Sequence, residues 1–137
     1  MRPKPVERSQ KIRIFVGNHY ELVDVPGKCV HSYTLCVNFE DPAILKKSAS
    51  FINKVKWELH ETYKNPIRET AAVNGKQFEF KARAWGWFDV PITIYWHSKT
   101  GLKQTTVNHT LYFNPAGKQK AYEFEIKESY LNEILNK

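Results

Sequence analysis

The stretch FINKVKWELHETYKNPIR, residues 51–68, decides how the rest of the chain is interpreted. In its first half Val55, Trp57 and Leu59 are apolar, and a charged residue precedes each of them. Successive side chains of a β-strand point to opposite faces, so this alternation is typical of a strand with one face in the core. The second half contains Asn65-Pro66, a pair that favours a turn. We therefore predict a half-buried strand that ends in a loop.

The same alternation recurs on both sides of this strand, and breaker-rich connections such as Glu40-Asp41-Pro42 and Asn74-Gly75 separate the segments. About seven or eight short strands at this spacing predict an all-β fold, an immunoglobulin-like β-sandwich of about eight antiparallel strands. The core-facing members of the further strands are expected to be Ile12, Ile14 and Val16; Tyr33, Leu35 and Val37; Phe78 and Phe80; Ile92, Ile94 and Trp96; apolar residues of 107–113; and Tyr122, Phe124 and Ile126.

Two segments have helical features instead. Residues 43–50 are expected to form a turn or two. An apolar stripe at helical spacing predicts a short C-terminal helix that packs on the sandwich, and its members are Tyr130, Leu131, Ile134 and Leu135. No repeat or second domain is visible in the 137 residues. We expect one domain over residues 12–137, preceded by a basic N-terminal extension over residues 1–11.

The formal net charge of +7 suggests an anionic partner, such as nucleic acid or an acidic protein. Apart from a group near the start of the chain, however, the basic residues are scattered, which is typical of a solvated face. The basic start would add a weak, nonspecific and salt-dependent contact with DNA. The aromatic fraction of 14% favours a surface that stacks on its ligand.

The cysteines and the hydropathy of the chain indicate in which cellular compartment the protein works. Cys29 and Cys36 are seven residues apart, beyond disulfide reach along an extended segment, which favours a reducing, intracellular environment. No apolar run approaches the roughly 18 residues of a membrane span. The basic N-terminus has no apolar stretch behind it, so we expect neither a membrane anchor nor secretion.

Motifs of catalysis and of metal binding are absent from the sequence. The histidines outside the 51–68 stretch do not have the spacing of metal ligands: His19, His31, His97 and His109. There is no Gly-rich phosphate loop and no nucleophile elbow. Thr62 follows His60 by two residues, but no third group that would orient the histidine accompanies them. We expect a binding module that is not an enzyme and uses neither a metal nor a cofactor.

The 51–68 stretch resembles the YEATS family of chromatin readers, whose pattern here is hydrophobic-x-K-V-x-F-x-L-H-E-S-[FY]-x-N-P-x-R. Gly17-Asn18 resembles the early G-N that closes the family's first strand. Residues 31–37 resemble H-x-W-x-x-x-V, with Tyr33 in place of Trp. Ala84-Trp85-Gly86-Trp87-Phe88 looks like the G-W-G-x-F loop, and residues 106–111 are similar to the family's closing strand. The resemblance covers about residues 12–130.

This resemblance implies a domain that binds acetyl-lysine, and often the longer and flatter crotonyl-lysine, on histone tails. The pocket would lie between loops at one end of the sandwich. By motif position its residues are His60, Thr62 and Tyr63 from the first loop, Ala84, Trp85, Gly86 and Trp87 from the second, and Cys29 at the far end. The resemblance also implies a nuclear protein, a subunit of a chromatin remodelling or acetyltransferase complex.

These residue types suit an acylated lysine. Acylation replaces a solvated ammonium by a flat neutral amide, whose N–H and C=O each cost about 1–3 kcal/mol if they are buried without a partner. On the family's pattern the Thr62 hydroxyl accepts the ligand N–H, the Trp85 backbone N–H donates to the ligand carbonyl, and His60 orients the hydroxyl. The rings of Tyr63 and Trp85 would sandwich the amide and its acyl tail.

Two alternatives stay open. A methyl-lysine cage also uses aromatic rings, but it needs several at angles and often a carboxylate. Glu61 could supply one, although strand alternation would point it away from the pocket if His60 points inward. The second alternative is an immunoglobulin-like protein-interaction or histone-chaperone module with no dependence on acylation, in which the rings of Tyr63 and Trp85 collapse onto each other.

Three departures from the family's pattern leave the specificity open. Cys29 stands where relatives often have an aromatic residue or a histidine, and Trp87 stands where they have a small or acidic residue. The family's acidic residues that grip an arginine beside the target lysine have no counterpart at Asn108 and His109. The preferred acyl group and the histone site are therefore not predicted.

Overall fold

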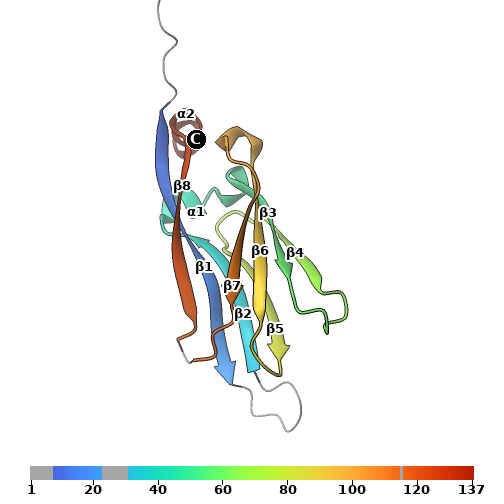
Figure 1. Ribbon diagram of the computed structural model, residues 1–137. Coiled ribbons are helices and arrows are strands. Elements are labelled where there is room, and N and C mark those ends of the chain that lie inside the picture. The colour runs from blue at the N-terminus through green and yellow to red at the C-terminus, as the bar shows by residue number, and fades with distance from the viewer. Residues whose placement is uncertain (1–7, 23–30, 115) are drawn as a thin grey trace, which may run out of the picture.

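Figure 1 shows the computed structural model of the chain, which describes residues 8–22, 31–114 and 116–137. Within these residues two four-stranded sheets have the strand orders β5-β2-β1-β8 and β4-β3-β6-β7. All neighbouring strands are antiparallel. The strands are β1 (Ser9–Leu22), β2 (His31–Phe39), β3 (Ile52–Glu58), β4 (Ile67–Ala71), β5 (Phe78–Ala84), β6 (Asp89–Trp96), β7 (Thr105–Thr110) and β8 (Lys118–Lys127).

The helices are short. They are α1 (Pro42–Leu45), α2 (Glu128–Leu135) and two 3-10 turns at Ser48–Ser50 and Ser98–Thr100. Both predicted helical segments are confirmed, and so is the immunoglobulin-like β-sandwich with a short C-terminal helix. In α2 the predicted stripe is buried except for Leu135 at its end, which stays exposed. The hydroxyl of Tyr130 donates to the carbonyl of Ser50 at 2.6 Å and so joins α2 to the turn before β3.

The core lies between the two sheets, where the inward side chains of the alternating segments meet. The alternation predicted for β3 is confirmed, because Val55, Trp57 and Leu59 are all buried. The indole N–H of Trp57 donates to the Thr70 hydroxyl at 2.8 Å, so the polar atom of this buried ring has a partner. Phe80, also expected in the core, is only half-buried and packs against the core from the edge strand β5.

β1 is longer than the sequence predicted. Gly17-Asn18 lie in its middle and do not close it, since the pairing with β2 continues as far as Leu22. The glycine is needed at this position for a different structural reason. A Cβ at position 17 would lie 2.0 Å from the carbonyl oxygen of Lys118, so only glycine allows β8 to approach this closely.

The buried side chain of Asn18 connects the two sheets. Its Nδ2 donates to the carbonyls of His19 and Tyr112 at 3.1 and 3.0 Å, and its Oδ1 accepts from the backbone N–H of Tyr112 at 3.0 Å. The fourth contact is with His109 of β7, whose Nε2 lies 2.7 Å from Oδ1. Because Oδ1 can only accept, His109 carries its proton on Nε2. Burial, together with the charge of Lys118, lowers the pKa of His109 to about 4.

Two strand boundaries differ from the prediction. β4 was not predicted, because its side chains are exposed apart from half-buried Thr70 and give no apolar alternation. β7 ends at Thr110, short of the predicted residue 113. After β7 the backbone N–H of Leu111 donates to the carbonyl of Phe88 at 3.1 Å, so the chain there contacts the loop that precedes β6.

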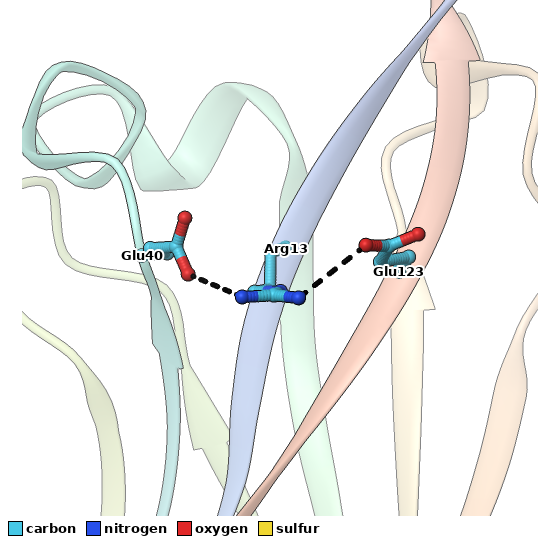
Figure 2. Close-up of polar contacts among 3 residues, drawn as sticks. All are labelled: Arg13, Glu40 and Glu123. Atoms are coloured by element: carbon cyan, nitrogen blue, oxygen red, sulfur yellow. Dashed lines mark hydrogen bonds and ion pairs between the residues drawn. The ribbon is translucent and has the colours of Figure 1, made fainter.

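Ion pairs join β1 to the segments on either side of it. Arg13 forms ion pairs with Glu40 at 3.3 Å and Glu123 at 3.5 Å, one on each side of the strand (Figure 2). These side chains are about half exposed, so each pair contributes only about 0–1 kcal/mol. β1 already begins at Ser9, before the predicted start at residue 12. The division into an extension and a domain itself stays a prediction.

The loops expected to form the pocket, 59–66 after β3 and 85–88 after β5, lie toward the lower end of the sandwich in Figure 1. This placement follows from the antiparallel order, because β3 and β5 run toward the same end of their sheets. No described helix is long and apolar enough to cross a bilayer.

Candidate functional site

The first loop presents a paired histidine and threonine. His60 Nδ1 lies 2.9 Å from the Thr62 hydroxyl oxygen, and the backbone N–H of Thr62 donates to the same ring nitrogen at 3.2 Å. A nitrogen that accepts from a backbone N–H carries no proton, so the hydroxyl of Thr62 must donate to it as well. The hydroxyl therefore keeps its lone pairs as acceptors. Thr62 is exposed and His60 half-buried behind it.

A guanidinium closes the base of the first loop. Arg68, at the start of β4, donates from Nε to the carbonyl of Asn65 at 3.0 Å, and its guanidinium lies 5.6 Å from the ring centre of Phe80 in β5. Asn65 has a left-handed backbone, with φ of 56°. The backbone N–H of Leu59 donates to the carbonyl of Pro66 at 2.8 Å. The loop is thus tied to itself and to the neighbouring sheet.

Tyr63 is anchored at its phenol. Its hydroxyl donates to the backbone carbonyl of Arg83 at 2.5 Å and lies 3.0 Å from the hydroxyl of Tyr33 in β2. Since the single hydroxyl proton of Tyr63 goes to the carbonyl, Tyr33 is the donor in the second bond. Tyr33 is buried, and burial together with the bond to Tyr63 raises the pKa of its phenol.

Phe88, in the second loop, packs against two rings of the first loop. Its ring centre lies 5.7 Å from those of Tyr63 and His60, and 6.2 Å from that of Tyr33 in an edge-to-face arrangement. Sequence reasoning did not assign Phe88 to the site. The signal was present, because Phe88 is the last residue of the five-residue segment from which the neighbouring site residues were taken.

Thr62, Tyr63, Arg83 and Trp85 line one hollow of about 170 Å³. The predicted tyrosine and tryptophan therefore line a common space, and so does Thr62, the residue whose hydroxyl is predicted to bind the ligand amide. Trp85 is 67% exposed, so one wall of the hollow is open to solvent. Arg83, which sequence reasoning missed, also lines the hollow; it lies in β5, two residues before Trp85 in the loop that follows.

The other predicted residues lie around this hollow. Ala84 is buried in β5, where it pairs with His31, and belongs to the core. Gly86 is half-buried in the second loop. Trp87 is 70% exposed and does not line the hollow. Cys29 lies outside the described residues, so its predicted place at the far end stays a prediction.

Among the described residues that line the hollow there is no carboxylate. Glu61 is exposed and is not among the residues around the hollow. Within the described part of the chain, no three His, Cys, Asp or Glu side chains gather so as to hold a metal ion. The hollow therefore offers a hydroxyl, aromatic faces and one cationic residue, which is a surface for a neutral or anionic flat group.

A family model described as the YEATS family matches residues 28–115. The protein AF-9 homolog of Kluyveromyces lactis is 34% identical over 97 residues, which cover 62% of this chain and 43% of that protein. The protein AF-9 homolog of Saccharomyces cerevisiae is 35% identical over 92 residues, 67% of this chain and 38% of that protein. In the TFIID subunit 14 of Schizosaccharomyces pombe the match is 34% over 67 residues, 49% of this chain and 25% of that protein. The chain thus spans less than half the length of these relatives.

Solved structures agree over nearly the whole chain. The Yaf9 YEATS domain recognizing an H3K122suc peptide superposes with a TM-score of 0.70 and 27% identity, covering 98% of each chain. The Yaf9 YEATS domain bound to H3K27ac superposes with a TM-score of 0.70 and 26% identity over the same share. Each of these two Yaf9 domains binds an acylated histone H3 peptide.

Proposed function

The chain belongs to the YEATS family, and on that premise we propose that it is a histone reader, which binds acetylated or crotonylated lysine on histone tails between Tyr63 and Trp85. One observation carries the proposal: Thr62, Tyr63 and Trp85 line a single hollow. The two solved relatives that bind acylated H3 peptides support the class of ligand.

The polar groups of the hollow match an amide. The Thr62 hydroxyl donates to His60 and is left to accept the N–H of the acylated lysine. The backbone N–H of Trp85 makes no hydrogen bond within the described part of the chain, which leaves it to donate to the ligand carbonyl. Each of these bonds removes a desolvation cost of about 1–3 kcal/mol from the bound amide.

The same lining rejects an unmodified lysine. A buried ammonium needs a carboxylate or several acceptors, and the charged residue among the described ones at the hollow is Arg83, which has the same sign as the ammonium. Acylation removes that charge and adds a flat surface, on which the rings of Tyr63 and Trp85 can stack. Binding should therefore depend on the modification. A lining whose described residues include no carboxylate also disfavours a methyl-lysine cage, whose ligand stays cationic.

The biological setting belongs to the proposal as well. One relative is named as a subunit of the transcription initiation factor TFIID, which supports a nuclear protein that works within a chromatin complex. We propose that this chain recruits such a complex by binding alone, without catalysis. Its basic residues would add a weak contact with DNA.

Titration with three versions of one histone H3 tail peptide tests the proposal. The lysine is unmodified, acetylated or crotonylated, and isothermal calorimetry measures each affinity. We expect at least a tenfold preference for the acylated peptides, corresponding to about 1.4 kcal/mol. Equal affinity for all three would favour the alternative, an interaction or chaperone module, for which the exposed Trp85 and Trp87 would be a protein-binding surface.

A further inference from the structure

We infer that Tyr33 is a positioning residue for the pocket, which holds the ring of Tyr63 in place and so sets how narrowly the hollow selects flat acyl groups. This inference rests on the proposed function. Tyr33 lies in β2, on neither pocket loop, and it does not line the hollow. Its effect would therefore pass through Tyr63.

The hydrogen-bond chain has one direction. Tyr33 is 1% exposed, so its hydroxyl proton must find a partner inside the protein. The Tyr63 hydroxyl oxygen, at 3.0 Å, is the partner that the structure gives it. The Tyr63 proton is committed to the Arg83 carbonyl, so the order is Tyr33 to Tyr63 to Arg83.

This chain joins the two walls of the hollow. Tyr63 belongs to the loop after β3, a strand of one sheet, whereas Arg83 lies in β5 of the other sheet, two residues before Trp85 in the loop that follows. Fixing the phenol on the Arg83 carbonyl therefore fixes the tyrosine ring relative to β5, the strand after which the loop with Trp85 begins. Tyr33, from the strand next to β5, secures the same oxygen from inside.

Without Tyr33 as donor, the Tyr63 ring keeps its contact with Phe88 and one bond to a carbonyl at the surface. A ring held at fewer points can move away from Trp85, and a wider hollow discriminates less between planar and branched ligands. Loss of the donor should thus lower affinity for the crotonyl peptide and, more specifically, lower the ratio of crotonyl to isobutyryl affinity.

The test compares Tyr33→Phe with Tyr130→Phe. Both remove one buried phenol hydroxyl that donates a hydrogen bond, but Tyr130 donates to Ser50 beside α2, in contact with neither pocket loop. Affinities for crotonylated, isobutyrylated and unmodified H3 peptides are measured for each variant, and thermal unfolding shows that each is folded. We expect Tyr33→Phe to reduce the crotonyl to isobutyryl ratio about three- to tenfold, and Tyr130→Phe to leave it unchanged.

Tyr63→Phe and the double variant complete the design. Because Tyr33 acts only through the Tyr63 hydroxyl, the ratio in Tyr33→Phe/Tyr63→Phe should equal that of Tyr63→Phe alone, and the two losses should not multiply. This inference alone would be overturned if Tyr33→Phe kept both the preference for acylated over unmodified peptide and the full crotonyl to isobutyryl ratio. It would also be overturned if the losses in the double variant were multiplicative. Equal binding of acylated and unmodified peptides by the wild type would overturn the proposed function, and the inference with it.

Discussion

The hydroxyl and the backbone nitrogen of Thr62 both lie within hydrogen-bond distance of His60 Nδ1, at 2.9 and 3.2 Å. A backbone N–H can only donate, so the ring nitrogen carries no proton and is the acceptor in both contacts. The histidine therefore leaves the threonine hydroxyl with its acceptor side free. An amide N–H in the hollow could use that acceptor without any rearrangement of the loop.

The first prediction concerns this hydroxyl. Thr62→Val keeps the shape of the side chain but leaves the N–H of the bound amide without an acceptor, and should weaken acyl-peptide binding at least tenfold. Calorimetric titration of the acetylated peptide measures the change. Thr62→Ser, which keeps the hydroxyl, is the matched control and should bind within about threefold of the wild type. Wild-type affinity in Thr62→Val would show that the hydroxyl does not touch the amide.

The second prediction separates two neighbouring tryptophans. Trp85 and Trp87 are 67% and 70% exposed, but only Trp85 lines the hollow. Trp85→Ala should abolish the preference for acylated over unmodified peptide, while Trp87→Ala should change it less than about threefold. Because both rings are largely exposed, neither variant should lower the melting temperature appreciably. An equal loss in the two variants would contradict the placement of the ligand.

The third prediction concerns Arg68 of β4, which contacts both the first pocket loop, at Asn65, and the other sheet, at Phe80. Removing its guanidinium in Arg68→Ala frees the Asn65 carbonyl and the face of Phe80. Amide hydrogen exchange over residues 60–65 should become faster, with an acyl-peptide affinity lowered about two- to fivefold. Lys64→Ala changes an exposed cation on the same loop and should do neither. Unchanged exchange in Arg68→Ala would mean that the loop holds its conformation by itself.

The fourth prediction concerns acid stability. The pKa of His109 is about 4 in the folded protein and 6.5 in an unfolded chain. Below pH 6.5 the unfolded chain therefore binds a proton that the folded protein does not bind. Stability should fall with decreasing pH down to about pH 4, by up to about 1.4 kcal/mol per pH unit from this residue.

Urea unfolding at about pH 7 and about pH 5 measures the effect of His109. In His109→Gln the side-chain amide N–H can still donate to Asn18, but nothing titrates, so the free energy of unfolding should decline less with acidification. Parallel pH profiles of the two proteins would rule out a buried neutral histidine. The comparison isolates His109, because both proteins share every other titratable group.

How much the sequence could predict differs between strands. The strands whose apolar residues alternate, such as β3 with Trp57 and β6 with Ile92, were predicted because one face of each is buried in the core. β4 was missed for the converse reason: it is an exposed edge strand, held by its ladder with β3, and hydrogen bonds of the backbone leave no trace in residue type. The length of β1 beyond Asn18 was missed in the same way.

The site divides along a similar line. Its local part could be predicted, because His60, Thr62 and Tyr63 lie within one loop and Trp85 within another, each in a recognisable run of residues. The roles of Phe88, Arg83 and Tyr33 could not. They depend on contacts between β2, β5 and the loop after β3, which lie at 30 and 20 residues' separation in the pairs Tyr33–Tyr63 and Tyr63–Arg83.

The amino-acid sequence by itself determined the sandwich and the two loops that carry the recognition chemistry, because alternation and turn residues act between near neighbours in the chain. The tertiary structure alone decided that Tyr63 and Trp85 line a common hollow, that Ala84 belongs to the core and that Trp87 does not line the hollow. The reason is that a phenol finds its hydrogen-bond partners, and a ring its stacking partner, only after two sheets have packed and brought separate strands to one end.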